Sequence, residues 1–312
     1  MRGASPAEQA LTGTTDCRGP LQSAGTHPPS APVPFTTERS GSEQLIRPGF
    51  DPSVPNVARI YNWLLGGKDN FACDRRAAAK LLDAVPHAAL AARENRAFLH
   101  RAVRFLAHEA GIRQFLDIGA GLPAASAVHE IIHGAVPPPV VVYADNDPVV
   151  IRHAEALTGG RAGVAAVQAD LRQPRELLDV AANRTLIDLA QPVAILLVAV
   201  LHFVEDSEDP FAIVNSYKDH MGPGSFLVIS HVTADHIPPG AARQAREAYA
   251  DASAPGVPRT RGEVLEFFGG LEMVRPGLVN VSAWRPRDRR PSADPALFYA
   301  GIGRKTMPGM PR

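Results

Sequence analysis

The sequence predicts an α/β fold: a doubly wound, mostly parallel sheet that ends in an antiparallel C-terminal strand. Between residues 113 and 230, short apolar runs alternate with helical stretches; they read QFLDIG, VVVYAD, VAAVQAD, PVAILLVAV and SFLVIS. Strands that alternate with helices form βαβ units whose parallel sheet is covered on both faces. Two later apolar runs, at 277–284 and 296–303, are joined by RPRDRRPSADP. This linker is too short and proline-rich for a crossover helix, so we expect the two runs to be antiparallel.

The region before the first strand divides into a tail and a helical cap. Residues 1–48 are rich in Pro, Gly, Ser and Thr and offer little apolar surface, so we expect a disordered tail. Residues 49–111 are expected to form a helical lid. In it Pro55 suits a helix start, one helix runs from about Asp74 to Pro86, and a longer one runs from about Ala91 to Ala110.

Residues 112–305 are expected to form the sheet domain, with a helical insertion around 239–270. Within the insertion, Ala241 to Ala250 and Arg261 to Phe268 have helical patterns. Because this insertion follows the fifth strand, we expect it to shape specificity together with the lid.

The composition bears on whether the protein binds nucleic acid or a membrane and on where in the cell it is located. Lysine plus arginine (32) equals aspartate plus glutamate (32), so no overall field favours nucleic acid or an anionic membrane. The longest apolar run, Val193 to Leu201, has nine residues, whereas a membrane-spanning helix needs roughly 20. The first residues contain no apolar signal segment, and the two cysteines, Cys17 and Cys73, form no CxxC pair. We therefore expect a cytoplasmic protein with reduced thiols and no membrane anchor.

The strongest local signal is a glycine turn after the first strand, in FLDIGAGLPAA, Phe115 to Ala125. Gly119 and Gly121 suit a tight strand-to-helix turn where a ligand approaches the backbone closely. The turn also satisfies the dinucleotide pattern G-x-G-x-x-A. Glycine turns of this kind also occur in sheets that bind no ligand, so the turn predicts a ligand site only together with the residues that follow the neighbouring strands.

Acidic residues follow the next two strands. Asp145 ends the second strand and can accept hydrogen bonds from both hydroxyls of a ribose. Asp170 ends the third, where it can meet an adenine amino group. Asn146 and Leu171, which directly follow them, belong to the same candidate cofactor site, because the carboxyl edge of an open α/β sheet is where ligands bind. Asp147 is expected instead to cap the following helix.

Asp117 bears on which nucleoside cofactor this edge would bind. A carboxylate two residues before the first glycine would repel the pyrophosphate of a dinucleotide. S-adenosylmethionine (SAM) has no phosphate and carries an ammonium and a sulfonium, which a carboxylate assists. The order D-x-G-x-G therefore favours SAM, and Asp117 joins Gly119 and Gly121 as a candidate cofactor residue.

Five blocks of this chain together resemble one family; they read ARIYNWLLGGKDNFACDR, FLDIGAGLP, VYADNDPVV, LLVAVLHFVED and GLVNVSAWRP. They are similar to the signatures of a SAM-dependent methyltransferase family long catalogued in bacteria as a domain of unknown function. The resemblance covers roughly residues 50 to 305 and implies a class I methyltransferase fold and SAM binding, without a known substrate. Three positions depart from it: Asn62 stands where the family pattern has Asp, and Ala120 and Ala127 stand where it has Thr and Asn.

The block around LLGGKDNF is a candidate lid, because the segment before the first strand of class I methyltransferases often folds over the cofactor. The Gly66-Gly67 pair would let the backbone turn against the methionine end of SAM, and a polar side chain would hold its carboxylate. The alternative is a helix–turn–helix corner in which Asp69 or Asn70 caps the next helix and Lys68 lies in solvent. The candidate cofactor residues here are Tyr61, Gly67, Lys68, Asn70 and Arg75.

Histidines after the fourth and fifth strands could serve the acceptor. His202 lies just past the fourth strand and could take a proton from an attacking atom; a wall histidine bonded to backbone is the alternative. His231 and His236 could line the substrate side or serve core and loop roles. None of the eleven histidines pairs with a Cys or a carboxylate at metal-ligand spacing, so we expect no metal.

The expected function is a SAM-dependent methyl transfer to an unidentified small-molecule acceptor. One alternative is a SAM-binding regulatory or interaction protein without turnover, because binding and turnover share the pocket residues. Another is an NAD(P)-dependent oxidoreductase, which Asp117 disfavours and for which the later half has no Tyr-x-x-x-Lys pair. The oligomeric state and the need for a catalytic base are not predicted.

Overall fold

The computed structural model describes residues 51–122, 127–135, 137–184, 187–233, 235, 237–286 and 297–306. They fall within one unit, residues 46–312. The tail expected over residues 1–48 lies outside the described residues. The boundaries of the cap, 49–111, and of the sheet domain, 112–305, stay predictions.

The sheet has the predicted class I topology, with strand order β3-β2-β1-β4-β5-β8-β6. Strands β1 to β5 are parallel, and β8 runs antiparallel to β5 and to the short β6 and β7. The expected α/β class, with a parallel sheet and a reversed C-terminal strand, is therefore confirmed. The strands are β1 (Gln114–Ile118), β2 (Val140–Asp145), β3 (Val164–Gln168), β4 (Ala194–Val198), β5 (Phe226–Val232), β6 (Glu272–Met273), β7 (Val279–Asn280) and β8 (Phe298–Arg304).

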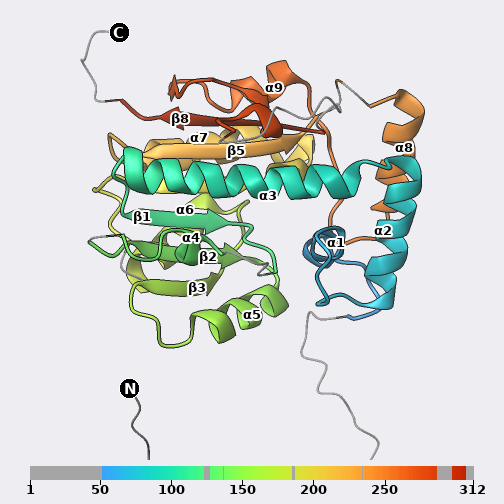
Figure 1. Cartoon of the computed structure of the whole chain (residues 1–312), viewed down its shortest axis with the longest axis horizontal. Coiled ribbons are helices and arrows are strands. Elements are labelled where there is room, and N and C mark those ends of the chain that lie inside the picture. The colour runs from blue at the N-terminus through green and yellow to red at the C-terminus, as the bar shows by residue number, and fades with distance from the viewer. Residues whose placement is uncertain are drawn as a thin grey trace, which may run out of the picture. The chain divides into compact units, whose positions relative to one another are not determined.

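Alternating side chains of the strands pack into two apolar layers, one on each face of the sheet. In β5, Phe226 and Val228 belong to one layer, and Leu227 and Ile229 belong to the other. Figure 1 shows α3 running along one face, with α6 and α7 behind the sheet. The helices of the sheet region are α3 (Ala88–Arg104), α4 (Val128–Ile131), α5 (Pro148–Thr158), α6 (Pro174–Arg184), α7 (Pro210–His220) and α9 (Arg261–Glu266).

Three helices gather beside the carboxyl ends of the parallel strands, as Figure 1 shows. They are α1 (Val57–Leu64), α2 (Ala72–Ala84) and α8 (Pro239–Ala248). The helices expected before the first strand exist, but α2 and α3 each begin two to three residues earlier than predicted, and α3 passes into a π-helical turn over Phe105–Glu109. In the described part of the chain, no helix is both long and apolar enough to cross a membrane.

The strand expected over 277–284 is wrong in its second half. Only Val279–Asn280 pairs with β8, and a 3₁₀ turn follows over Val281–Ala283. The carbonyls of Val281 and Trp284 accept hydrogen bonds from the Arg101 guanidinium on α3 instead of a strand partner. This turn buries Trp284 against Phe98, with ring centroids 5.4 Å apart in an edge-to-face contact.

Replacing Trp284 by alanine should remove the main anchor between α3 and the C-terminal edge. We expect the free energy of unfolding in urea to fall by about 3–5 kcal/mol, as for other buried aromatic truncations. Leu265→Ala is the control, because Leu265 is 40% exposed and its truncation should change stability by only about 0.5 kcal/mol. Equal losses for the two variants would contradict this role of Trp284.

Candidate functional site

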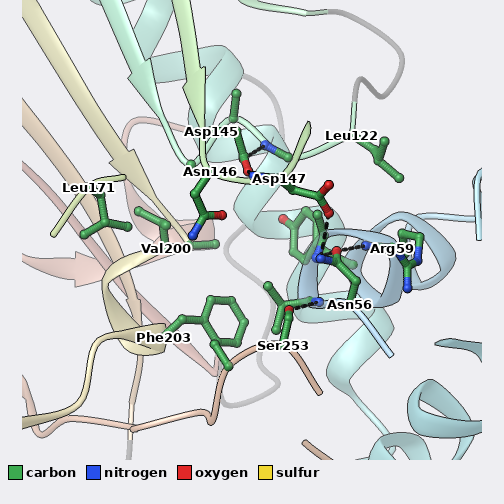
Figure 2. A pocket seen from close by; sticks show the side chains of 18 of the residues that line it. Asn56, Arg59, Leu122, Asp145, Asn146, Asp147, Leu171, Val200, Phe203 and Ser253 are labelled. Carbon is green, nitrogen blue, oxygen red and sulfur yellow. Dashed lines mark hydrogen bonds between the residues drawn. The ribbon is translucent and has the colours of Figure 1, made fainter. Parts of the chain in front are cut away.

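A cleft of about 490 Å³ opens at the carboxyl ends of β1, β2, β3 and β4, under α1 and beside α3. Figure 2 shows Asn146, Leu171 and Val200 on one side of it, across from Asn56 and Arg59 on the cap. Of the candidate cofactor residues, those that line the cleft are Tyr61, Asp117, Gly119, Gly121, Asp145, Asn146, Asp170 and Leu171. The structure thus brings together the candidates from three strand ends.

Both glycines of the turn after β1 have positive φ, +68° at Gly119 and +64° at Gly121. A Cβ at Gly119 would lie 2.3 Å from a methyl group of Val200, so a side chain there would displace the cleft wall after β4. At Gly121 a Cβ would meet little, and its N–H donates to Oδ2 of Asp145 at 3.0 Å. The turn therefore needs glycine for backbone conformation at both positions and for packing at the first.

Two buried carboxyl groups face the cleft from neighbouring strands. Burial raises the pKa of Asp117 to about 7; Arg96 opposes this rise, and Asp145 adds to it. Burial also raises the pKa of Asp145 to about 6, although the N–H groups of Asp147 and Gly121 donate to it. Near neutral pH the cleft thus holds one or two desolvated carboxylates, which favour a cationic ligand.

Asp170 carries a different charge environment at the end of β3. Burial alone would raise the pKa of its carboxyl, but hydrogen bonds and the charge of Arg172 lower it. The Arg172 guanidinium lies 2.6 Å from Asp170 and 3.1 Å from Glu208. Asp170 is therefore ionised, and both of its carboxylate oxygens already accept hydrogen bonds from Arg172.

A hydrogen bond that the sequence interpretation missed joins the cap to the sheet. Asn56 caps α1 by accepting from the N–H groups of Ala58 and Arg59, and its Nδ2 donates to Oδ2 of Asp147 at 2.8 Å. Asp147 in turn caps α5 by accepting from Val149 N–H at 2.7 Å, as predicted. An Asn before an amphipathic run is a helix-start signal, but the partner lies 91 residues away.

A buried ion pair holds α1 against α2. Arg59 Nε lies 2.7 Å from Asp74, and both side chains are almost fully buried. Asp74 also accepts from the backbone N–H groups of Asn56 and Phe71, and Arg59 donates to the carbonyl of Val54. Because every charge here is hydrogen-bonded, the pair is compatible with burial and orients the start of α1 toward the sheet.

The LLGGKDNF turn is built around Asn62 rather than around the cleft. The buried Oδ1 of Asn62 accepts from Asp69 N–H and from Asn70 Nδ2, and Arg75 donates to Asn70. A Cβ at Gly67 would lie within 2.6 Å of the Asn62 side chain. Neither Asp69 nor Asn70 caps α2, which starts after Phe71. The four candidates that do not line the cleft are Gly67, Lys68, Asn70 and Arg75.

The candidate acceptor residues lie apart from the cleft. His202 lines a neighbouring, smaller cavity. His231 is buried and binds the Val232 carbonyl and the Arg259 guanidinium through its two ring nitrogens; burial lowers its pKa to about 3. This bonding favours the core role for His231, whereas His236 lies outside the described residues. No cluster of three or more His, Cys, Asp or Glu that could hold a metal occurs among the residues that the structure describes.

This chain is similar to known proteins of one family. The model of a family described as S-adenosyl methyltransferase matches residues 43–306. A proposed methyltransferase from Thermobifida fusca YX is 39% identical with a TM-score of 0.78, over 85% of this chain and 100% of that one. A DUF574 family protein from Streptomyces avermitilis MA-4680 is 37% identical with a TM-score of 0.77, over 82% and 99%. No curated protein matches. These matches confirm the resemblance inferred from the five blocks.

Replacing Asn56 by aspartate should loosen the cap from the sheet. The variant keeps the shape and the helix-capping oxygen, but it loses the donor to Asp147 and sets two carboxylates against each other. We expect the amides of α1 to exchange with deuterium about tenfold faster at pH 7, the change that follows from losing roughly 1.4 kcal/mol of a charge-assisted hydrogen bond.

Asn56→Ser is the matched control, because serine keeps the cap without adding a charge. Its effect should be smaller, and high salt should narrow the difference between the two variants. Wild-type exchange in the aspartate variant would mean that this hydrogen bond does not hold the cap.

Proposed function

This chain belongs to the S-adenosyl methyltransferase family, and we propose that it binds SAM in the cleft at the strand ends and methylates a small-molecule acceptor. The observation that carries the assignment of the site is the pair of buried carboxyl groups, Asp117 and Asp145, beside a glycine turn in a cleft of about 490 Å³. Ligand pockets in proteins commonly measure roughly 300–1,000 Å³, so the cleft has a suitable size.

The residues present fit SAM group by group. Asp117 is the partner for the cationic methionine end, and Asp145 is the acceptor for the ribose hydroxyls. Asp170 and Leu171 lie where an adenine would contact an acceptor oxygen and an apolar side chain. Arg96 on α3 also lines the cleft, close enough to Asp117 to lower its pKa, and is the proposed partner of the methionine carboxylate.

In this proposal Arg96 takes the role that the sequence interpretation gave to Lys68, Asn70 or Arg75. Arg59 lines the cleft as well, but its guanidinium is held by Asp74 and Val54. We therefore assign it to the support of α1. For Gly67, Lys68, Asn70 and Arg75 we propose a structural role, in which the turn around Asn62 sets the direction of α1 and α2.

The protein's part in the transfer is positioning. SAM would supply a methyl group on a sulfonium: the methyl carbon would bond to the acceptor atom as the carbon–sulfur bond breaks with its electron pair left on sulfur, and the methylated atom would release its proton to water. The charged groups of the cleft hold the donor, while α1 and the Tyr61 ring cover it and exclude water. The Tyr61 hydroxyl donates to the Ala92 carbonyl and accepts from Asn95 Nδ2, and these two hydrogen bonds fix the ring.

A nicotinamide cofactor fits the same cleft poorly. Its pyrophosphate would have to lie at the glycine turn, beside the buried carboxyl groups of Asp117 and Asp145. Two functions then remain for a SAM-binding cleft: methyl transfer, or SAM binding without turnover. Transfer of labelled methyl from SAM into small molecules of a cell extract separates them.

Calorimetric titration should detect micromolar SAM binding and no heat with NAD or NADP. Asp145→Ala should weaken SAM binding by an order of magnitude or more, because hydrogen bonds to a charged group contribute about 1.5–3 kcal/mol. Since Asp145 also accepts from the backbone of the glycine turn, the thermal midpoint of the variant serves as a folding control. Unchanged SAM affinity in a folded variant would refute this placement of the ribose.

SAM affinity should also rise with pH through the pKa of Asp117. The free protein has this pKa near 7, and a bound cation favours the carboxylate, so binding releases a proton below that pH. The affinity for SAM is then at its maximum above pH 7 and falls by up to about tenfold per pH unit below pH 7. Asp117→Asn should bind more weakly at pH 8 and lose this part of the pH dependence.

Comparing wild type and Asp117→Asn in the same buffers cancels the ionisation of SAM itself. The other titrating cleft carboxyl, Asp145, is present in both proteins, so its ionisation contributes to both pH profiles. Parallel pH profiles for the two proteins would exclude Asp117 as the group that meets the cationic end.

A further inference from the structure

A second cavity, of about 110 Å³, lies beside the cleft and shares three lining residues with it, Val57, Tyr61 and Phe203. Its other walls come from α2, α3 and α8 and from the ends of β5 and β8. They are aliphatic and aromatic side chains, among them Leu64, Leu81, Val85, Ala245, Tyr249 and Phe298. The cavity therefore adjoins the cleft across one wall and is itself apolar.

One residue that lines this cavity, His202, carries a buried polar atom without a hydrogen-bond partner in the part of the chain that the structure describes. Nδ1 of His202 is buried and has no hydrogen-bond partner among the described residues. Burial lowers the pKa of His202 well below its usual value, and the nearby His231 and Arg259 add to this effect, so the ring is neutral. A buried polar atom without a partner costs free energy, and a ligand that donates a hydrogen bond to Nδ1 would remove that cost.

The size and polarity of the cavity define what it can hold. An apolar cavity of roughly 150 Å³ in another protein binds benzene, so a cavity of this size suits a single planar ring. A cationic ligand would find no counter-charge here, and an anionic ligand would have to leave its charge at the edge of the cavity, where the exposed Arg246 lies, because the interior is apolar. The shared Tyr61 adds an aromatic face, since its hydroxyl is already engaged by Ala92 and Asn95.

We propose that this cavity binds the methyl acceptor, and that the acceptor is an uncharged aromatic molecule whose hydroxyl or amino group donates a hydrogen bond to Nδ1 of His202. The proposal deepens the proposed function and rests on it, because the wall formed by Val57, Tyr61 and Phe203 sets this ring beside the cleft assigned to SAM. His202 then binds and orients the acceptor, and the hydroxyl or amino group, once methylated, releases its proton to water.

The test uses ¹⁹F NMR titrations of the full chain with three probes, 4-fluorophenol, fluorobenzene and 4-fluorobenzoate, in the presence of SAM. We expect 4-fluorophenol to bind best and the charged 4-fluorobenzoate at least about tenfold more weakly. His202→Phe should reduce the preference for 4-fluorophenol over fluorobenzene by roughly 2- to 12-fold, the range for one neutral hydrogen bond. A purely structural role of His202 would leave this preference unchanged.

Two tryptophan variants on α8 provide the matched control. Ala245→Trp fills the cavity and should abolish binding of 4-fluorophenol, whereas Gln244→Trp places the same side chain at an exposed position that does not line the cavity. Ala242→Phe, at a second lining position, replaces Ala245→Trp if that variant fails to fold. Equal binding of 4-fluorophenol by the filled and control variants would overturn the proposal, as would an unchanged preference in His202→Phe.

SAM titration of the wild type separates this proposal from the one on which it rests. Wild type that binds SAM but none of the ring probes contradicts the acceptor cavity alone. Failure to bind SAM contradicts the proposed function itself. Retention of SAM affinity in Ala245→Trp, together with loss of 4-fluorophenol, supports two separate sites for donor and acceptor.

Discussion

The hydrogen bond from Asn56 to Asp147 is the contact on which the geometry of the cleft depends. It joins the first turn of α1 to the first turn of α5, and Asp147 N–H donates onward to Asp145. Asp145 in turn accepts from Gly121 N–H. One continuous network therefore runs from the cap, through two helix starts, to the glycine turn, and it aligns the groups that face the cleft (Figure 2).

The cleft contains two carboxyl groups, Asp117 and Asp145, at buried positions that disfavour their charged form. Asp117 and Asp145 have pKa values raised above that of an exposed carboxyl, so the folded state binds protons that the unfolded chain has already released. Their contribution to stability is greatest at low pH and is lost as pH rises toward 7. A cationic ligand reverses this penalty. Instability of the empty site and affinity for its ligand thus have the same physical origin.

The parts of the site that follow from short-range pattern were predictable from sequence. Gly119 and Gly121 follow a strand directly, and the carboxyl edge of a parallel sheet collects the residues after each strand, so Asp145 and Asp170 were expected to meet. No sequence pattern marked Arg96 as a site residue. It lies within a helix before the first strand, and it lines the cleft only because α3 packs across the sheet. In the LLGGKDNF turn, the Asp69 N–H and the Asn70 side chain donate to Asn62, a contact that depends on how the turn folds back and that the sequence did not indicate.

The position of His202 shows why residue order along a strand end does not by itself assign a side chain to a site. After β4 the chain enters a 3₁₀ turn, Leu201–Phe203, in which successive side chains point in different directions. Phe203 lines both cavities, whereas His202 lines only the apolar one. Hydrogen bonds from the segment before α9 hold this turn: Val257 N–H donates to the His202 carbonyl, and the Arg259 guanidinium donates to the Leu201 carbonyl. The helical insertion therefore fixes which residue faces the donor side and which faces the apolar side, and changes in the insertion can alter the apolar cavity without disturbing the strand ends that line the cleft.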